Sequence, residues 1–293
     1  MRSNSQSKAR AENLIEALPY IQQFRGRTFV IKYGGSAMED EHQVDRLLRD
    51  IVFLEAVGIN PVVVHGGGKV ITARMREAGL KAKFVNGLRV TDTATIQIVH
   101  ESLDQVINPG IVERIQKFGG KAVGLSGKDV FVAKKLGPQT NEEGHSEDIG
   151  FVGEAAQVQH REVKAAVKNE IVPVISPIGA TTDGAILNIN ADVAAAALAA
   201  SLKAEKLIFV SDVLGIMRNP AEADSLIPSV HIKDVLALIK QKVVDGGMIP
   251  KVQSAMDALA KGVGKVHLIS GAIPHCLLLE IFTDSGIGTE IVR

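Results

Sequence analysis

Two lysines of this chain stand where lysines are uncommon, beside glycine-rich turns. Lys32 belongs to an apolar segment, residues 28–33, that is followed directly by a Gly-Gly pair. A buried ammonium group needs an anionic partner or a function, because burying an unpaired charge is costly. Lys251 follows Pro250 in what we expect to be the first turn of a helix, where the helix dipole disfavours a cation. A bound anion would explain both positions, since helix N-termini and glycine amides bind phosphate groups.

Each of these features also has a simpler structural explanation. Lys32 could lie on an edge strand and reach solvent, and Lys251 could be an exposed surface lysine. Asp192, near the start of an alanine-rich helix, could be an ordinary first-turn acid or could hold the lysines in place. Taken together, two lysines, glycine amides and one acid favour phosphoryl transfer, a reaction that depends on positioning and charge neutralisation. This pattern does not identify the acceptor.

Motifs for several other chemistries are absent from the sequence. It contains no Gly-x-x-x-x-Gly-Lys-Ser/Thr, which excludes a P-loop enzyme, and no Gly-x-Gly-x-x-Gly, which disfavours a dehydrogenase on a doubly wound fold. It also lacks His-Glu-x-x-His, paired Cys-x-x-Cys and Gly-x-Ser-x-Gly, so neither a zinc site nor a serine hydrolase has support. We therefore assign no metal ligand to any residue.

The elements that must position these residues follow a repeating order. Residues 28–33 and 61–65 predict buried strands, and each ends in glycines and leads into an amphipathic helix. Strand, glycine loop and helix, twice over, predict an α/β fold with parallel strands. Ligands of such sheets lie at the carboxyl ends of the strands, where both glycine loops fall.

The rest of the chain divides into three segments. An amphipathic helix over residues 11–24 precedes the first strand, and it either packs on its own domain or forms an oligomer contact. After this extension (residues 1–26), two lobes cover residues 27–180 and 181–293, with a soft boundary and no linker. Within them we expect a hairpin at residues 83–91, a loop at 137–150, and final strands at 265–270 and 277–282.

Composition narrows the class of protein further. The 33 basic and 33 acidic residues give a formal net charge of zero, which argues against a general nucleic-acid or membrane-surface role. The single cysteine, Cys276, fits a reducing compartment. The longest apolar run is too short to span a bilayer, and the N-terminus lacks a hydrophobic signal core. These features predict a cytoplasmic protein.

Six segments resemble the acetylglutamate kinases, a branch of the amino-acid kinase family. They occur in the family's order, span nearly the whole chain, and show no departure from the catalytic pattern. The Lys-x-Gly-Gly and Ser-Asp-x-x-Gly motifs are shared across the wider family, whereas Asn-Gly-Leu-Arg-Val-Thr and Asn-x-Asn-Ala-Asp point to the acetylglutamate branch. The segments are residues 31–35, 64–68, 86–91, 187–192, 210–215 and 245–251.

The resemblance implies an open αβα sandwich with a mainly parallel central sheet. It implies acceptor binding in the N-terminal lobe and ATP binding in the C-terminal lobe. The reaction would be ATP plus N-acetyl-L-glutamate giving ADP plus N-acetyl-L-glutamyl 5-phosphate, a step of arginine biosynthesis, with Mg²⁺ bridging phosphate oxygens.

Roles for individual residues also follow from the resemblance. The lysines 32 and 251 would stabilise the transition state from two sides, with Asp192 orienting them. Arg89 would grip the α-carboxylate of the acceptor, a bidentate task for which Arg is suited. The other residues implied at the acceptor are Gly67, Gly68, Asn188 and Asn190. The residues implied at the nucleotide are Gly34, Gly35, Ser211, Asp212, Gly215 and Met248.

The same resemblance implies a role for the N-terminal helix. Arginine-inhibited members of the family have such an extension, which interlaces dimers into a hexamer, a trimer of dimers. Arginine binds there between the helix and the C-terminal strands, and a nitrogen-signalling regulatory protein is a further candidate partner. Glu280 would pair with the guanidinium, although it could also be a surface acid. The matching residues are Tyr20, Lys206, His275, Glu280 and Gly286.

Two alternatives to this function stay open. Another member of the family could use glutamate, aspartate, carbamate or a nucleoside monophosphate as acceptor, although Arg89 and Asn188 argue against these. A non-catalytic arginine sensor would bind the amino acid and a partner protein without turnover, but the intact set of two lysines and Asp192 disfavours it.

Overall fold

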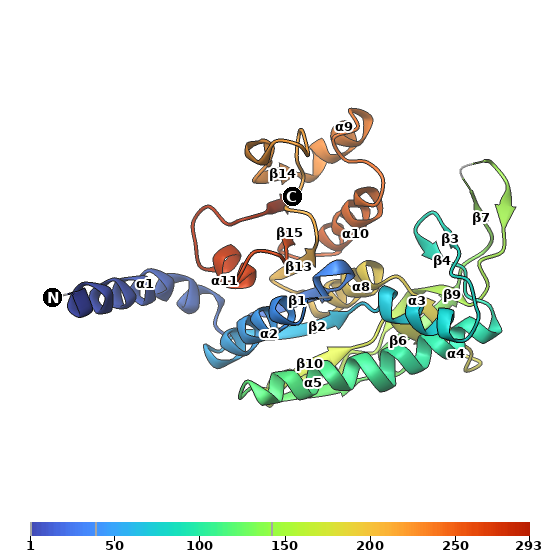
Figure 1. Cartoon of the computed structure of the whole chain (residues 1–293), viewed down its shortest axis with the longest axis horizontal. Coiled ribbons are helices and arrows are strands. Elements are labelled where there is room, and N and C mark those ends of the chain that lie inside the picture. Colours follow the sequence, from blue (N-terminus) through green and yellow to red (C-terminus); the bar gives the residue numbers. More distant parts are fainter. Residues whose placement is uncertain (1, 39, 142) are drawn as a thin grey trace.

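The first strand, β1 (Thr28–Tyr33), lies at the centre of a mainly parallel sheet. The computed structural model describes residues 2–38, 40–141 and 143–293, and its main sheet has eight strands in the order β14-β16-β15-β13-β1-β2-β10-β5 (Figure 1). Only the β15–β16 contact is antiparallel. The expected α/β class and mainly parallel sheet are confirmed. The order places β1 between β2 (Asn60–His65) and β13 (Lys206–Ser211).

Alternation along β1 builds two separate cores, one on each face of the sheet. Phe29 and Ile31 pack against the layer that holds α2, α3, α4, α5 and α11, whereas Val30 packs against the layer that holds α7, α8 and α10. Successive side chains of a strand point to opposite faces, so Lys32 emerges on the same side as Val30. The three layers are those of an open αβα sandwich.

The bounds of the remaining elements complete this description. The helices are α1 (Arg2–Phe24), α2 (Glu41–Ala56), α3 (Gly68–Glu77), α4 (Thr93–Glu101), α5 (Asn108–Lys117), α6 (Gly127–Val130), α7 (Arg161–Lys168), α8 (Ala191–Leu202), α9 (Val235–Lys240), α10 (Met248–Ala260) and α11 (Cys276–Ile281). The outer strands of the main sheet are β5 (Ala122–Leu125), β10 (Val172–Ile175), β14 (Ser229–His231), β15 (Lys265–Ser270) and β16 (Thr289–Val292). A π-helix, Ser102–Ile107, joins α4 to α5.

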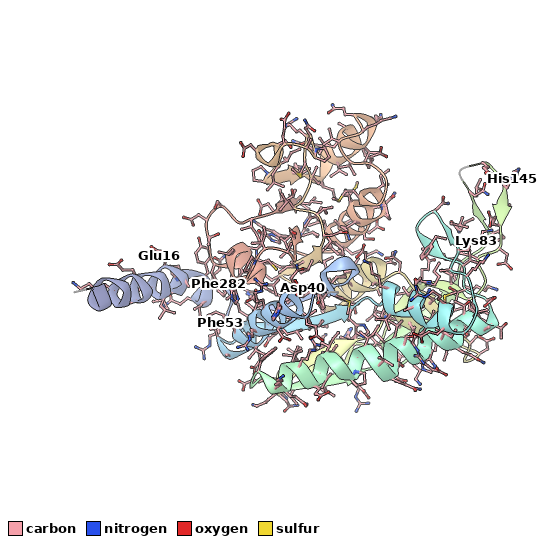
Figure 2. All side chains as sticks on the ribbon, viewed as in Figure 1. Glu16, Asp40, Phe53, Lys83, His145 and Phe282 are labelled. Atoms are coloured by element: carbon pink, nitrogen blue, oxygen red, sulfur yellow. The ribbon has the colours of Figure 1, made fainter. Side chains whose placement is uncertain are left out.

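The other strands lie outside the main sheet. Four of them close into a small barrel: β6 (Phe131–Lys135), β9 (Val152–Val158), β11 (Ile178–Ala180) and β12 (Ile186–Ile189). Two hairpins project beside it, β3–β4 (Phe84–Val85 and Leu88–Arg89) and β7–β8 (Gln139–Thr140 and Ser146–Glu147). Lys83 and His145 mark these hairpins in Figure 2, and the ion pair between Lys83 and Glu147 joins them.

The N-terminal helix α1 extends away from the sheet, with its N-terminus far from the rest of the molecule (Figure 1). Leu14 and Ile15 are about two thirds exposed, and Leu18 is also exposed. Its C-terminal end packs on the body, where the rings of Phe24 and Phe29 meet edge to face. Among the described residues, no helix combines the length and the apolar character needed to cross a membrane.

Two expected elements differ from the structure. The segment 277–282 is not a strand but lies mostly in the short helix α11, and β16 supplies the final strand. The buried Asp50 of α2 explains this, because its carboxylate accepts hydrogen bonds from the Leu277 N–H at 3.3 Å and from His275 at 2.6 Å. The expected loop at 137–150 contains the β7–β8 hairpin among its described residues.

Candidate active site

Two glycine loops meet at the carboxyl edge of the sheet. The Gly66 N–H donates to the Tyr33 carbonyl at 2.7 Å, which ties the end of β2 to the end of β1. A Cβ added at Gly34 would lie 3.2 Å from the Gly66 Cα, so the loops pass each other closely only because both residues lack side chains. Their backbone amides therefore reach one small region, as the sequence pattern predicts.

Asp192 holds both lysines at this edge. Its Oδ1 lies 2.9 Å from the Lys32 Nζ, and its Oδ2 lies 2.8 Å from the Lys251 Nζ. Both lysines are buried, at 8 % exposure each, so neither an edge lysine nor a surface lysine describes them. Asp192 is also more than a first-turn acid, although it does lie in the first turn of α8. The dipole penalty for Lys251 in the first turn of α10 is offset by this carboxylate.

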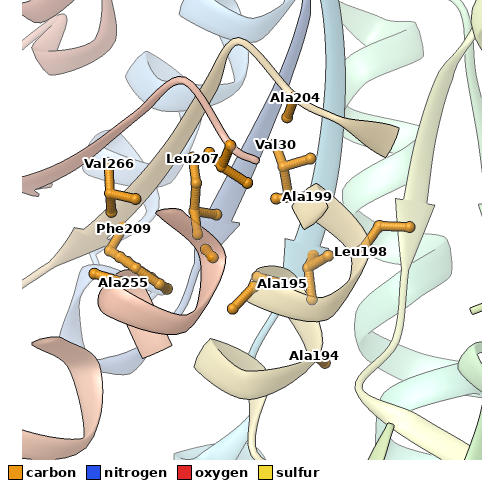
Figure 3. Packing of buried hydrophobic residues seen from close by; sticks show 14 of the residues in the cluster. Val30, Ala194, Ala195, Leu198, Ala199, Ala204, Leu207, Phe209, Ala255 and Val266 are labelled. Atoms are coloured by element: carbon orange, nitrogen blue, oxygen red, sulfur yellow. The ribbon is translucent and has the colours of Figure 1, made fainter. Parts of the chain in front are cut away.

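Small residues bring the two helices of this cluster together. The helix α8 packs on α10 through alanines, and Ala195 and Ala255 face Phe209 of β13 in the core (Figure 3). Side chains of one carbon let helix backbones approach closely, so the short Asp192 side chain reaches Lys251 from the neighbouring helix. The alanine-rich sequence of α8 thus sets the geometry of the charged cluster.

The electrostatics of the cluster follow from burial and mutual attraction. Burial opposes ionisation of Asp192, but the two ammonium groups dominate and hold the pKa of its carboxyl at about 2. Burial lowers the pKa of Lys251, and the Asp192 carboxylate counteracts part of this shift. Two ammonium groups and one carboxylate leave an excess positive charge, which suits an anionic ligand.

Acid should weaken the fold through Asp192 in a measurable way. Its folded pKa lies below the ordinary value, so its contribution to stability is present above about pH 4 and is lost as pH falls towards 2. The shift corresponds to roughly 2 kcal/mol. Urea unfolding of the native chain and of Asp192→Asn, at pH 5 and near pH 2, should show the difference between them shrinking by that amount. A difference independent of pH would contradict the assignment.

A cavity of about 360 Å³ opens beside this cluster, on the side of the β3–β4 hairpin. Lys32, Asp192, Gly67 and Gly68 line it, together with the buried Arg89. Gly68 is the first residue of α3, so the N-terminus of that helix faces the cavity and favours an anion there. The cavity therefore brings together a helix N-terminus and cations from β1 and β4.

Arg89 has no carboxylate partner in the described part of the chain. One terminal nitrogen, Nη2, donates to the Gly68 carbonyl and to the Thr72 hydroxyl, each at 2.8 Å. Its guanidinium carbon lies 4.7 Å from the centre of the Phe84 ring. Burial lowers the pKa of Arg89 from its ordinary value. Thr72 and Phe84 were not identified from the sequence, although Thr72 follows Gly68 by one helical turn.

Asn188 and Asn190 differ in which side-chain hydrogen-bonding groups remain available to a ligand. Asn190 caps α8, because its Oδ1 accepts from the Asp192 N–H at 2.8 Å, so its amide oxygen is already engaged. Asn188 donates only weakly, to the Thr91 hydroxyl at 3.3 Å. Both side chains line the cavity. Asn188 thus keeps its carbonyl oxygen available, and Asn190 can offer only its amide nitrogen.

The residues expected at the nucleotide lie on the other side of the lysines. Ser211 ends β13, on the face that carries Lys32, and its buried hydroxyl has no hydrogen-bond partner among the described residues. Asp212 lies near enough to Lys251 to oppose slightly the lowering of that lysine's pKa by burial. Met248 is the first residue of α10. Gly215 has no room for a side chain, because an added Cβ would lie 2.5 Å from the Thr289 hydroxyl oxygen. Gly34 and Gly35 join the two sides, and Gly35 also lines the 360 Å³ cavity.

Within the described residues, no group of three or more His, Cys, Asp or Glu side chains could hold a metal ion. Asp192, the carboxylate nearest to the cavity, is engaged with both lysines. A divalent cation at this site would therefore be carried by phosphate oxygens of a ligand. That arrangement fits Mg²⁺ bound to ATP, because Mg²⁺ commonly takes few protein ligands beside substrate phosphates.

A second cavity, of about 550 Å³, lies between the end of α1 and the C-terminal strands. Tyr20, Lys206, Glu280 and Gly286 line it, and Glu280 is buried rather than a surface acid. His275 does not line this cavity, contrary to the sequence-based expectation, because its ring is bound to Asp50.

His267 occupies the second cavity instead of His275. Its Nδ1–H donates to Glu280 at 2.6 Å, and its Nε2 accepts from the Lys206 ammonium at 2.9 Å. Burial opposes ionisation of Glu280, but His267 and two backbone amides hold the pKa of its carboxyl below the ordinary value. The register of β13 and β15 pairs His267 with Ile208, two residues after Lys206, a proximity that the sequence alone does not reveal.

Comparison with known proteins decides the family. The amino acid kinase family matches residues 27–270. Acetylglutamate kinase from Akkermansia muciniphila is 51% identical over 284 residues, which cover 97% of this chain and 95% of that protein. Acetylglutamate kinase from Nostoc sp. is 48% identical over 285 residues, covering 97% of this chain and 93% of that protein.

The chain belongs to the acetylglutamate kinase branch of the amino acid kinase family. The recognition from the six sequence segments is thereby confirmed. The open αβα fold is shared with a carbamate kinase from Giardia, which superposes with a TM-score of 0.66 at 17% identity and covers 91% of this chain and 99% of that one.

A solved structure of an N-acetylglutamate synthase is also similar to this chain. The Neisseria gonorrhoeae enzyme, solved with coenzyme A and N-acetyl-glutamate, superposes with a TM-score of 0.83 at 26% identity. The match covers 97% of this chain but only 63% of that longer protein. A complex of the same synthase with coenzyme A and L-arginine gives a TM-score of 0.80 at 25% identity, over 96% of this chain and 65% of that protein.

Proposed function

We propose that this enzyme transfers the γ-phosphoryl group of ATP to the side-chain carboxylate of N-acetyl-L-glutamate, in arginine biosynthesis. The observation that carries the proposal is the buried Lys32–Asp192–Lys251 cluster, set beside a cavity whose arginine has no carboxylate partner among the described residues. The names of relatives that are about half identical over nearly the whole chain support the same acceptor.

The two halves of the chain divide the work. In the lobe of residues 27–180, Arg89 binds the α-carboxylate of the acceptor, and Gly67 and Gly68 bind the acceptor through their backbone amides. Asn188 and Asn190, from the lobe of residues 181–293, complete the acceptor site. The nucleotide lies over Ser211, Asp212, Gly215 and Met248, with Gly34 and Gly35 near its β- and γ-phosphates. Lys32 and Lys251 flank the transferred group.

The chemistry needs no general base. A side-chain carboxylate is already ionised at neutral pH, so one of its oxygens attacks the γ-phosphorus directly. A new P–O bond forms, the bond from the γ-phosphorus to the β,γ-bridging oxygen breaks, and ADP leaves with the electron pair. Repulsion between the carboxylate and the triphosphate is the main obstacle. The two ammonium groups reduce that repulsion, and Mg²⁺ bound to the phosphates supplies further positive charge.

A panel of acceptors tests this proposal. ADP release should be measured with ATP and Mg²⁺ and with N-acetyl-L-glutamate, L-glutamate, L-aspartate, carbamate or a nucleoside monophosphate. We expect N-acetyl-L-glutamate to give the highest kcat/KM. A higher value for another compound would assign a different acceptor, and no turnover with any of them would favour a non-catalytic arginine sensor.

We also propose that L-arginine inhibits the enzyme through the 550 Å³ cavity. The cavity is lined by Glu280, Asp284 and Glu290, acids that attract a guanidinium group, and a structurally similar synthase has been solved with L-arginine. The exposed apolar face of α1 supports assembly into a hexamer, a trimer of dimers, through this helix. A cytoplasmic location and a nitrogen-signalling partner complete the proposal.

Arginine inhibition should depend on Glu280 and not on His275. In Glu280→Gln, the arginine concentration for half-inhibition should rise by about tenfold to a hundredfold, because one charge-assisted contact is lost. The matched control is His275→Asn, which should keep the response of the native enzyme because His275 lies outside the cavity. Deleting residues 1–26 should remove both inhibition and the hexamer, as seen by light scattering. An unchanged response in Glu280→Gln would exclude this cavity.

A further inference from the structure

His65 is fully buried at the end of β2, directly before the glycines that line the acceptor cavity. Its Nδ1 lies 2.8 Å from the Gly66 carbonyl oxygen, and its Nε2 lies 3.3 Å from the Asn108 amide nitrogen. A carbonyl only accepts, so Nδ1 carries the proton and Nε2 accepts from Asn108. Burial lowers the pKa of His65 to about 4, which keeps the ring neutral under ordinary conditions.

Asn108 is itself fixed from several sides. Its amide nitrogen also donates to the Val174 carbonyl at 2.9 Å, which ties it to β10. On β5, a Cβ added at Gly124 would lie 2.1 Å from its Oδ1, so only glycine leaves room for this side chain. Asn108 directly follows the π-helix, whose wider turn rotates the residues after it by about 100° relative to a regular helix. That rotation presents Asn108 to His65.

The glycine loop is also held from its other side. A Cβ added at Gly67 would lie 2.6 Å from a methyl carbon of Ile107 and 2.7 Å from one of Leu103. Both side chains come from the π-helix that precedes Asn108. The peptide between Gly66 and Gly67 therefore has its carbonyl bound by His65 and has apolar contacts next to its second residue.

Because the Gly66 carbonyl is anchored, the covalent geometry of the peptide also fixes the direction of the next N–H. In a trans peptide the C=O and the following N–H point opposite ways. The Gly66 carbonyl points to the buried ring, so the Gly67 N–H points away from it, and Gly67 lines the cavity. We propose that His65 is a positioning residue, which fixes the Gly66–Gly67 peptide so that the Gly67 N–H faces the reacting carboxylate of the acceptor. The catalytic role rests on the proposed function, whereas the hydrogen bond does not.

Two substitutions of His65 distinguish the role of its Nδ1 from that of its Nε2. The amide nitrogen of Asn occupies nearly the place of Nδ1, so His65→Asn can still donate to the Gly66 carbonyl. The amide oxygen of Gln can occupy nearly the place of Nε2, so His65→Gln can still accept from the Asn108 amide nitrogen but loses the hydrogen bond from Nδ1 to the Gly66 carbonyl. We expect kcat to fall by about tenfold to a hundredfold in His65→Gln, with KM for ATP little changed, because small misplacements of reacting groups have effects of this size. His65→Asn should recover most of kcat.

A purely structural role predicts a different result. In that case kcat would follow thermal stability, and the two variants would lose activity in proportion to their fall in Tm. Ile115→Val, a truncation in the core of α5 away from the cavity, gives the reference relation between Tm and kcat. Equal losses of kcat in His65→Asn and His65→Gln, or losses on that reference relation, would overturn the proposal.

The ring itself can be examined without any substrate. Nitrogen-15 NMR of the histidine rings in the native enzyme should show His65 neutral and protonated at Nδ1 throughout the neutral pH range. A ring protonated at Nε2, or at both nitrogens, would overturn the proposal whatever the acceptor is. A native enzyme with the expected ring but no turnover of N-acetyl-L-glutamate would instead refute the proposed function and uphold the hydrogen bond.

Discussion

Lys32→Met and Lys251→Met should each lower kcat by about 10²- to 10³-fold, the usual effect of removing one group that stabilises developing charge in a transition state. Methionine keeps the length and apolar body of lysine and removes the charge. Asp192 keeps one ammonium partner in either variant, at 2.8 or 2.9 Å, so no carboxylate is left buried and unpaired. The fold should therefore survive, and KM for the acceptor should change less than kcat.

Steady-state kinetics with both substrates varied, together with thermal unfolding, measures this expectation. Lys164→Met, on the exposed face of α7, is a matched control for the loss of one positive charge. The double variant Lys32→Met/Lys251→Met should unfold more easily than either single one, because it leaves the buried Asp192 carboxylate alone. Turnover close to that of the native enzyme in either single variant would exclude the assigned clamp.

The charged cluster could be predicted from the sequence because its signals are local. Lys32 is unusual because it lies within an apolar strand, and Lys251 is unusual because it lies in the first turn of a helix. Both signals can be recognised without knowledge of the tertiary structure. The glycine loops have equally local signals at strand ends. The sequence pattern could not predict that Lys32 lies on the face of β1 that packs against α8 and α10. That depends on which face of the sheet each helix covers.

The second cavity shows why other residues were missed. His275 and His267 are eight positions apart, and neither has a distinctive neighbourhood in the sequence. Their environments are decided by tertiary contacts: Asp50 of α2 binds His275, whereas the parallel pairing of β13 and β15 brings His267 beside Lys206. The same contact of Asp50 turns an apolar run that resembles a strand into the helix α11. In these places packing overrides local propensity.

Arg89 gives the second large effect that we expect. Its guanidinium is buried, stacked near Phe84, and held by Gly68 and Thr72, with no carboxylate partner among the described residues. Arg89→Met should lower kcat/KM for N-acetyl-L-glutamate by about 10²- to 10⁴-fold, because two charge-assisted hydrogen bonds to a carboxylate are lost. Arg89→Lys should recover only part of this, since an ammonium cannot reproduce the bidentate geometry. KM for ATP should stay nearly constant.

The effect of Arg89→Met on stability separates substrate binding from a structural role. A buried cation that supports the fold normally has an anionic partner, and its removal leaves that partner unpaired at a cost of several kcal/mol. Among the described residues, Arg89 leaves behind a carbonyl, a hydroxyl and the Met75 sulfur, all uncharged acceptors, so the free energy of unfolding without ligand should change by about 1 kcal/mol or less. The stabilisation that saturating N-acetyl-L-glutamate gives the native enzyme should disappear in Arg89→Met and persist in Arg76→Lys, an exposed arginine of α3. A large loss of stability with unchanged acceptor binding would instead assign Arg89 to the fold.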